Sequence, residues 1–168
     1  MAELAPRERL QPSLLDRLTD HEPDQTAEPR DRRVLSLRTL REGVLRDLGW
    51  LLNTTNLFSV TAHQGLPHLG NSVINYGIPD ISGMSISSMN IGVLERAIRQ
   101  AIWDYEPRLI RASVVVKAHN DRQSANTVQF DIEADMWAQP YPERLYLKTE
   151  LDLDCAVIRL TDMTGKRL

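Results

Sequence analysis

The stretch VQFDIEADM, residues 128–136, decides the fold because its apolar and polar side chains alternate strictly. A period of two is typical of a β-strand with one buried and one solvated face. The same pattern returns in LYLKTELDL, residues 145–153, and in shorter runs over residues 113–118 and 156–160. Three or four such strands with short connections predict an antiparallel meander that is apolar on one face.

Segments before these strands have the spacing of amphipathic helices. Leucine and valine recur at steps of three and four over residues 37–52, directly after Ser36, a residue type that caps helix N-termini. A second such segment begins near Asn90 and should end just before Pro107, which disfavours helix in the residue preceding it. A leucine turn over residues 14–18 is too short to be stable alone. The expected fold is α+β, with about three helices packed on a mainly antiparallel β-meander of three to four strands.

The chain is expected to divide into an N-terminal arm with a linker, residues 1–34, and a single domain, residues 35–168. Residues 19–33 contain no Ile, Leu, Val, Met, Phe, Trp or Tyr, so they can bury little surface and are interpreted as a flexible linker. The leucine turn before them has two open interpretations: it packs back on the domain, or it is a tethered docking peptide. In the second case its contact residues are Leu14, Leu15 and Leu18.

Composition and charge narrow the possible functions. The 168 residues carry 20 Lys and Arg against 23 Asp and Glu, a net charge of -3, and without an excess of positive charge nucleic acid is not an expected partner. No stretch approaches the roughly 18 apolar residues of a membrane span, and the N-terminus lacks the apolar run of an export signal. We therefore expect a cytoplasmic location without membrane insertion. The single cysteine, Cys155, is expected to be a small buried strand residue.

Motifs for catalysis, cofactors and metals are missing from the sequence. There is no G-x-S-x-G, G-x-G-x-x-G or G-x-x-x-x-G-K, and the four histidines fall in linker, loop or turn segments. No catalytic residue, cofactor or metal is therefore expected. Paired carboxylates leave one enzymatic alternative, the hydrolysis of glycosidic bonds. The carboxylates in the predicted strand are more simply explained as the polar residues on its solvated face. The candidate carboxylates are Asp104, Glu106, Asp131, Glu133 and Asp135.

One long segment is almost free of charge. From Leu57 to Leu94 the only Asp, Glu, Lys or Arg is Asp80, although 26% of the chain is charged. A free surface loop normally carries charge for solubility. The segment therefore packs against its own domain or lies beneath a partner protein, and the sequence leaves both interpretations open.

Tyr105-Glu106-Pro107-Arg108 marks the junction between the second long helix and the strands. Pro107 makes the local geometry rigid, and in an extended segment Glu106 and Arg108 point the same way. One interpretation is an intramolecular ion pair. The other is a docking element in which Arg108 binds a partner carboxylate and Glu106 receives a partner cation.

Several segments taken in order resemble a known family. They are PSLLDRL (12–18), RVLSLRTLREGVLRDLGWLLNT (33–54), SVINYGIPDISG (72–83), AIWDYEPRL (101–109) and MWAQPYPERLYLKTELDL (136–153). Together they are similar to the TssE family of baseplate wedge proteins in type VI secretion systems. That family is related to a wedge subunit of contractile-tail phages and is often labelled lysozyme-like.

The resemblance implies a structural protein, not an enzyme, that joins the wedge of a cytoplasmic baseplate to the first ring of the sheath. The implied partners are other wedge subunits, sheath subunits and the spike or hub. Glu106, Pro107 and Arg108 match a contact motif of the family, and an exposed strand edge would join the sheath by strand addition. A matching contact loop comprises Asn75, Tyr76, Gly77, Ile78, Pro79 and Asp80. The alternative, a peptidoglycan-cleaving lysozyme-like enzyme, explains neither the charge-poor segment nor the leucine turn.

Overall fold

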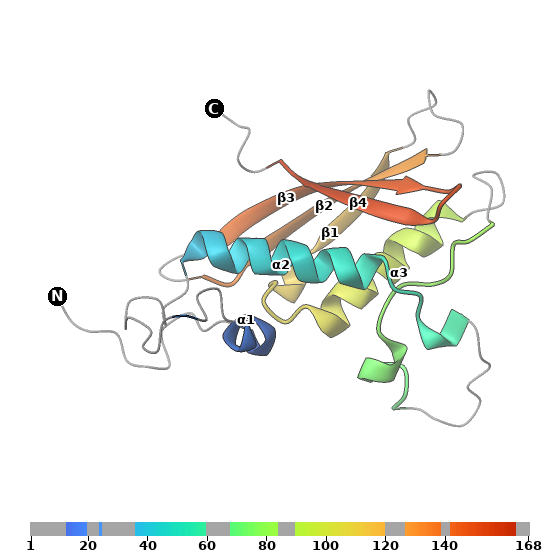
Figure 1. Ribbon diagram of the computed structural model, residues 1–168. Coiled ribbons are helices and arrows are strands. Elements are labelled where there is room, and N and C mark those ends of the chain that lie inside the picture. The colour runs from blue at the N-terminus through green and yellow to red at the C-terminus, as the bar shows by residue number, and fades with distance from the viewer. Residues whose placement is uncertain are drawn as a thin grey trace.

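The computed structural model describes residues 13–19, 24, 36–59, 68–83, 90–119, 127–138 and 142–163. Its helices are α1 (Leu14–Leu18), α2 (Leu37–Leu52) and α3 (Ile91–Tyr105). They are followed by the strands β1 (Val115–His119), β2 (Thr127–Met136), β3 (Glu143–Asp152) and β4 (Val157–Asp162). The strands form one antiparallel sheet in the order β1-β2-β3-β4 (Figure 1). The α+β class and the antiparallel meander expected from the sequence are both confirmed.

The two long helices begin where their capping residues predict. The Ser36 side chain accepts a hydrogen bond from the Thr39 N–H at 3.1 Å, and the Asn90 side chain accepts one from the Val93 N–H at 3.2 Å. Each cap satisfies one N–H that a helix start leaves without a partner. The helix α3 ends directly before Glu106, because Pro107 restricts that residue to non-helical conformations.

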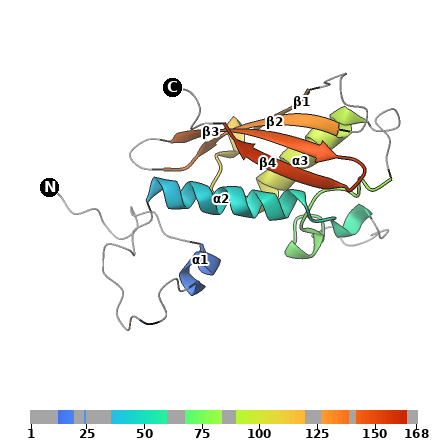
Figure 2. The ribbon, with the colours of Figure 1, turned by 45° about the horizontal axis from the view of Figure 1, so that its top comes forward.

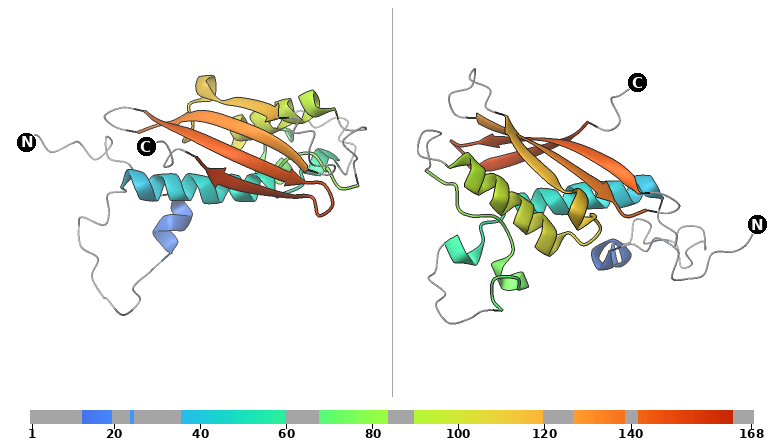
Figure 3. Two further views of the ribbon diagram at one scale, coloured as in Figure 1. Left: turned by 90° about the horizontal axis from the view of Figure 1, so that it is seen from above. Right: turned by 180° about the vertical axis from the view of Figure 1, so that it is seen from behind.

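The helices α2 and α3 cover one face of the sheet and leave the other face open, as Figures 2 and 3 show. Along β2 every second residue is buried, which is the alternation read from the sequence. The buried side chains of β2 and β3 pack on the apolar faces of the two helices to form the core. Fully buried members of this core include Leu48, Leu51, Ile98, Ile102, Phe130, Ile132 and Leu145.

The connection between β3 and β4 corrects one expectation from the sequence. Cys155 is exposed and lies in the turn between the strands, so the prediction of a buried strand residue is wrong. The physical reason is local: the Asp152 side chain accepts hydrogen bonds from the N–H groups of Asp154 and Cys155. Such a side-chain bond makes a turn out of residues that would otherwise extend the strand.

The short helix α1 lies beside α2 (Figure 1). Gly43 is buried on α2 where α1 approaches: a Cβ atom at that position would lie in ordinary van der Waals contact, 3.4 Å from Asp16 Oδ2 and 3.6 Å from Arg108 Nη1. Apart from Thr19 and Asp24, the expected linker lies outside the described residues. The division into an arm and a domain at residue 34 therefore remains a prediction.

Candidate partner-binding site

The corner formed by Glu106, Pro107 and Arg108 connects the end of α3 to the sheet. The Glu106 N–H donates to the Ile102 carbonyl at 3.0 Å, which closes the last turn of the helix. On the other side of the proline, the Trp137 N–H donates to the Arg108 carbonyl at 2.8 Å. The corner is thus fixed to a helix at one end and to the segment after β2 at the other.

Within this corner the side chains of Glu106 and Arg108 bind each other. Glu106 is only 3% exposed, and its Oε1 accepts bonds from Arg108 Nε at 2.7 Å and from the Arg108 N–H at 3.1 Å. Its Oε2 accepts from Arg108 Nη2 at 2.5 Å. The two planar groups therefore meet fork to fork, the strongest common arrangement of an arginine and a carboxylate. The intramolecular pair, one of the two interpretations of the sequence, is present in the isolated chain.

Further ion pairs extend from this corner across α2 to α1. Arg108 Nη2 lies 2.6 Å from Asp47 Oδ2, and Arg46 Nε donates to Asp47 Oδ1 at 2.9 Å. Arg46 Nη1 in turn donates to Asp16 Oδ1 of α1 at 2.5 Å. We call these five residues, Asp16, Arg46, Asp47, Glu106 and Arg108, the ion-pair chain. It joins three carboxylates to two guanidinium groups and links the arm to the corner.

The surroundings hold two members of the ion-pair chain, Arg108 and Asp16, in their charged forms. Burial acts to lower the pKa of Arg108, but the hydrogen bonds and charges of Glu106 and Asp47 outweigh it and raise that pKa above its usual value. The hydrogen bond from Arg46 lowers the pKa of Asp16, against the opposing effect of burial. Both groups are therefore ionised at neutral pH.

A groove with a volume of about 520 Å³ lies along the corner. Its volume is within the usual range of binding pockets, and aromatic and charged groups line it together. The rings of Tyr76 and Tyr105 meet edge to face, with centroids 5.2 Å apart. The lining residues are Ser13, Leu15, Asp47, Trp50, Leu51, Tyr76, Tyr105, Glu106, Pro107 and Arg108.

The loop that contains Asn75 to Asp80 is held mainly from inside the domain. Asn75 is buried, and its side chain accepts from the Phe58 N–H at 3.0 Å. Ile78 is 3% exposed and belongs to the hydrophobic core. Gly77 is buried, whereas Tyr76 and Pro79 are half-buried and Asp80 is exposed. In this part of the charge-poor segment the side chains of Asn75 and Ile78 pack against the chain itself; residues 60–67 and 84–89 lie outside the described residues.

Leu14 and Leu18 of α1 face away from the domain, whereas Leu15 lines the groove beside the corner. Leu14 and Leu18 are 70% and 74% exposed, and Leu15 is 44% exposed, although Asp16 on the same helix binds α2. The arm helix therefore packs back on the domain through Asp16 and Leu15 and presents Leu14 and Leu18 outward. The first of the two sequence interpretations, packing back on the domain, is therefore present, whereas docking on a partner remains a prediction.

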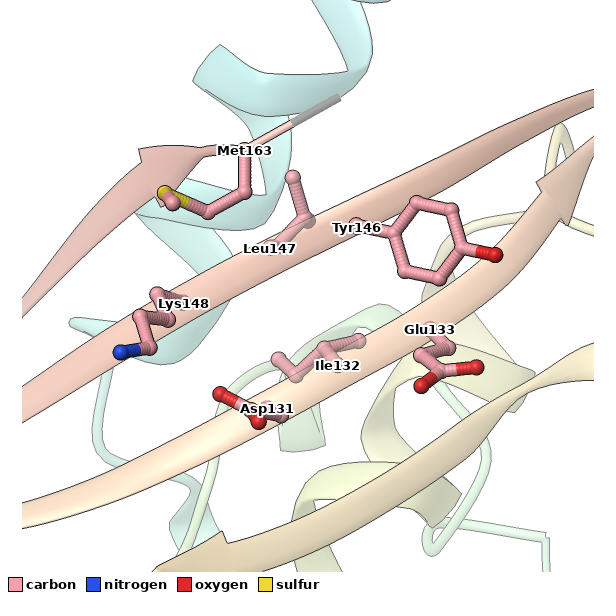
Figure 4. A pocket seen from close by; sticks show the side chains of 7 residues that line it. All are labelled: Asp131, Ile132, Glu133, Tyr146, Leu147, Lys148 and Met163. Atoms are coloured by element: carbon pink, nitrogen blue, oxygen red, sulfur yellow. The ribbon is translucent and has the colours of Figure 1, made fainter. Parts of the chain in front are cut away.

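A second, smaller cavity of about 250 Å³ lies on the open face of the sheet, between β2 and β3 (Figure 4). It is lined by Asp131, Ile132, Glu133, Tyr146, Leu147, Lys148 and Met163. Among the carboxylates considered for hydrolysis, Asp131 lies 2.5 Å from His119, Asp135 lies 3.1 Å from Arg144, and Asp104 lies 3.0 Å from Arg111. Each of the three thus has a basic neighbour, and the side chains of Asp131 and Asp135 are 35% and 31% exposed, whereas that of Asp104 is 9% exposed.

Within the described residues, no group of three or more His, Cys, Asp or Glu side chains is placed to hold a metal ion. No helix in that part of the chain is both long and apolar enough to cross a membrane.

Sequence reasoning singled out the corner but missed Asp16, Arg46 and Asp47. One signal was available on α2, where Gly43, Arg46 and Asp47 share a face at spacings of three and four. A glycine beside two charged residues on such a face is consistent with close approach of another charged element. Nothing local in the sequence indicates which element that is.

Comparison with models of known families identifies the class of protein. Residues 38–141, more than half of the chain, match the model described as "Baseplate wedge protein gp25", which makes the protein a structural component of a phage-tail-like baseplate. The chain belongs to the baseplate wedge protein gp25 family. The match contains the corner and the loop of residues 75–80, whereas α1, β3 and β4 lie outside it. Searches among curated proteins and among solved structures found no match.

Proposed function

We propose that the chain links the baseplate wedge of a contractile type VI secretion machine to its sheath and supports sheath assembly. The observation that carries the proposal is the position of the Glu106–Arg108 corner, which lies inside the matched family region and beside an open groove. The working location of such a protein is the cytoplasmic baseplate. Its partners are other wedge subunits, sheath subunits and the spike or hub.

In this proposal the corner contacts the sheath, and its residues have different roles. Pro107 is exposed and Arg108 retains 21% of its side-chain exposure, so these two residues are available to a partner. Glu106 is a positioning residue, because its buried carboxylate holds the guanidinium of Arg108 in one orientation. A prearranged guanidinium loses little conformational freedom when it binds a partner carboxylate.

The arm helix supplies the contact with the wedge. Leu14, Leu15 and Leu18 form an apolar face without a covering element among the described residues. Large exposed apolar faces are typical of protein interaction sites. Among the loop residues, the exposed Asp80 and the half-buried Tyr76 and Pro79 are the ones whose side chains reach the surface.

The test replaces Arg108 by Lys in cells where the variant is the sole copy, with fluorescently labelled sheath subunits as the readout. Lysine keeps the charge that pairs with Glu106 but cannot bind two carboxylates in the fork geometry of arginine. We expect fewer sheath assemblies at an unchanged level of the protein. Arg38→Lys, at a side chain that is 88% exposed on α2, is the matched control. Normal sheath assembly in the Arg108→Lys cells would exclude this residue as a sheath contact.

The enzymatic alternative is tested directly by adding the purified chain to a peptidoglycan suspension and following its turbidity. We expect the purified chain to leave the turbidity unchanged. If the unmodified chain clears the suspension and the Glu133→Gln variant does not, the proposed structural role is wrong and the chain is an enzyme.

A further inference from the structure

Each edge of the sheet is closed at one point by a side chain from a helix. At β4, Asn53 at the end of α2 accepts a hydrogen bond from the Ile158 N–H at 2.9 Å and donates one to the Ile158 carbonyl at 2.9 Å. At β1, Glu95 of α3 accepts a bond from the Ala118 N–H at 2.6 Å. Two different helices, α2 and α3, thus supply side chains that bind the backbone of the edge strands β4 and β1.

The backbone groups of Ile158 are those that an additional strand would use. The Met163 N–H donates to the Tyr146 carbonyl at 2.8 Å, and in an antiparallel ladder the direction of the backbone groups alternates along the strand. Odd-numbered residues of β4 therefore face β3, whereas Ile158 and Leu160 direct their N–H and C=O groups to the outer edge. The position of Asn53 beyond that edge agrees with this assignment.

Asn53 imitates one residue of a neighbouring strand. Its carboxamide offers a donor and an acceptor together, which aspartate and alanine do not. The side chain is also anchored to its own helix, because Nδ2 donates to the Gly49 carbonyl at 2.8 Å. Among the described residues, Asn53 binds the outer edge of β4 at Ile158, and none forms a corresponding bond at Leu160.

We propose that Asn53 is an edge plug that prevents β4 of one copy from pairing with β4 of a second copy. Unpaired backbone groups on an edge strand are a template for association with another chain. Two copies of β4 could pair antiparallel about a twofold axis at Arg159, with Ile158 of each copy opposite Leu160 of the other, and such contacts are self-complementary. The plug keeps the chain monomeric before it meets its partners. This inference does not depend on the identity of those partners.

The test compares the full chain carrying Asn53→Ala with Asn56→Ala, a matched change in the same turn whose side chain binds Ser59 and not the sheet. Sedimentation velocity over a range of concentrations reports the mass. We expect the unmodified chain and Asn56→Ala to be monomeric, and Asn53→Ala to form dimers or larger species as the concentration rises. At low concentration, hydrogen exchange of the Ile158 amide should be about fivefold faster or more in Asn53→Ala, since one hydrogen bond is lost.

A second variant shows where the association occurs. Leu160→Pro removes an outward N–H, which an edge strand tolerates, so adding it to Asn53→Ala should restore the monomer. Asn53→Ser, whose hydroxyl is too short to make both bonds, replaces Asn53→Ala if the latter does not fold. The proposal is overturned if the Asn53 variant stays monomeric, if Ile158 exchange is unchanged, or if Leu160→Pro leaves the association intact.

Discussion

Removal of the Arg108 side chain tests whether the corner is an internal ion pair or a free surface element. The guanidinium makes the hydrogen bonds that satisfy both oxygens of Glu106, a carboxylate that is 3% exposed, and it also binds Asp47. In Arg108→Ala, Glu106 would be left buried without a cation. Asp47 would keep its contact with Arg46.

The expected loss in the free energy of unfolding depends on how deeply Glu106 and Arg108 are buried. Breaking a buried ion pair by removing one member costs about 3–5 kcal/mol, whereas an exposed pair contributes about 0–1 kcal/mol. Because the Arg108 side chain is still 21% exposed, water reaches part of the site. We therefore expect a loss near the lower limit, about 3 kcal/mol in the free energy of unfolding.

Urea unfolding followed by tryptophan fluorescence measures this loss. Arg38→Ala, which removes an exposed partner of Glu42 on α2, should cost less than about 1 kcal/mol. Replacing both charges, in Glu106→Gln with Arg108→Met, should recover at least half of the loss, since no unpaired charge is then buried. A loss for Arg108→Ala as small as that for Arg38→Ala would refute the internal pair and favour a free docking element.

Three further changes test other parts of the structure. Ile78→Lys should lower the free energy of unfolding of the isolated chain by several kcal/mol, because it buries an unpaired charge. Ile74→Lys, at a 64% exposed position, should leave this free energy nearly unchanged; equal urea midpoints for the two variants would contradict the prediction. Asp16→Asn should speed hydrogen exchange in α1 while the sheet stays protected. Because the pKa of Asp16 is lowered in the folded chain, its stabilisation of α1 is present above about pH 4 and is lost as the pH falls through that lowered pKa. Exchange in α1 that is as slow in Asp16→Asn as in the unmodified chain at neutral pH would refute the ion pair as its attachment. Gly77→Ala should lower the melting temperature far more than Gly83→Ala, because only at Gly77 would a Cβ lie 2.1 Å from a backbone oxygen.

The parts of the fold that the sequence predicted are those determined by neighbouring residues. Alternation in residues 128–136 and 145–153 located two strands, and Ser36 and Asn90 located the starts of two helices. Cys155 was misplaced because a run of alternating side chains also continues into a turn. There the competing signal was the ability of the Asp152 side chain to bind the next backbone N–H groups.

The candidate site was predictable only in its local part. Glu106 and Arg108 are two residues apart, so their pairing was one of two interpretations available from the sequence. The bond from Arg108 to Asp47 spans 61 positions, and that from Asn53 to Ile158 spans 105. Contacts over such separations depend on how the helices pack on the sheet, and the periodicity of one segment does not determine that packing.

The most direct test of the account is photo-crosslinking from the corner in assembled baseplates. A photoreactive amino acid replaces Pro107, which is exposed, and the control places it at Arg38 on α2. The account predicts a covalent adduct between residue 107 and a sheath subunit, and none between residue 38 and that subunit. Adducts of residue 107 with wedge subunits alone, or none at all in baseplates that carry a sheath, would contradict the proposal that this corner joins the wedge to the sheath.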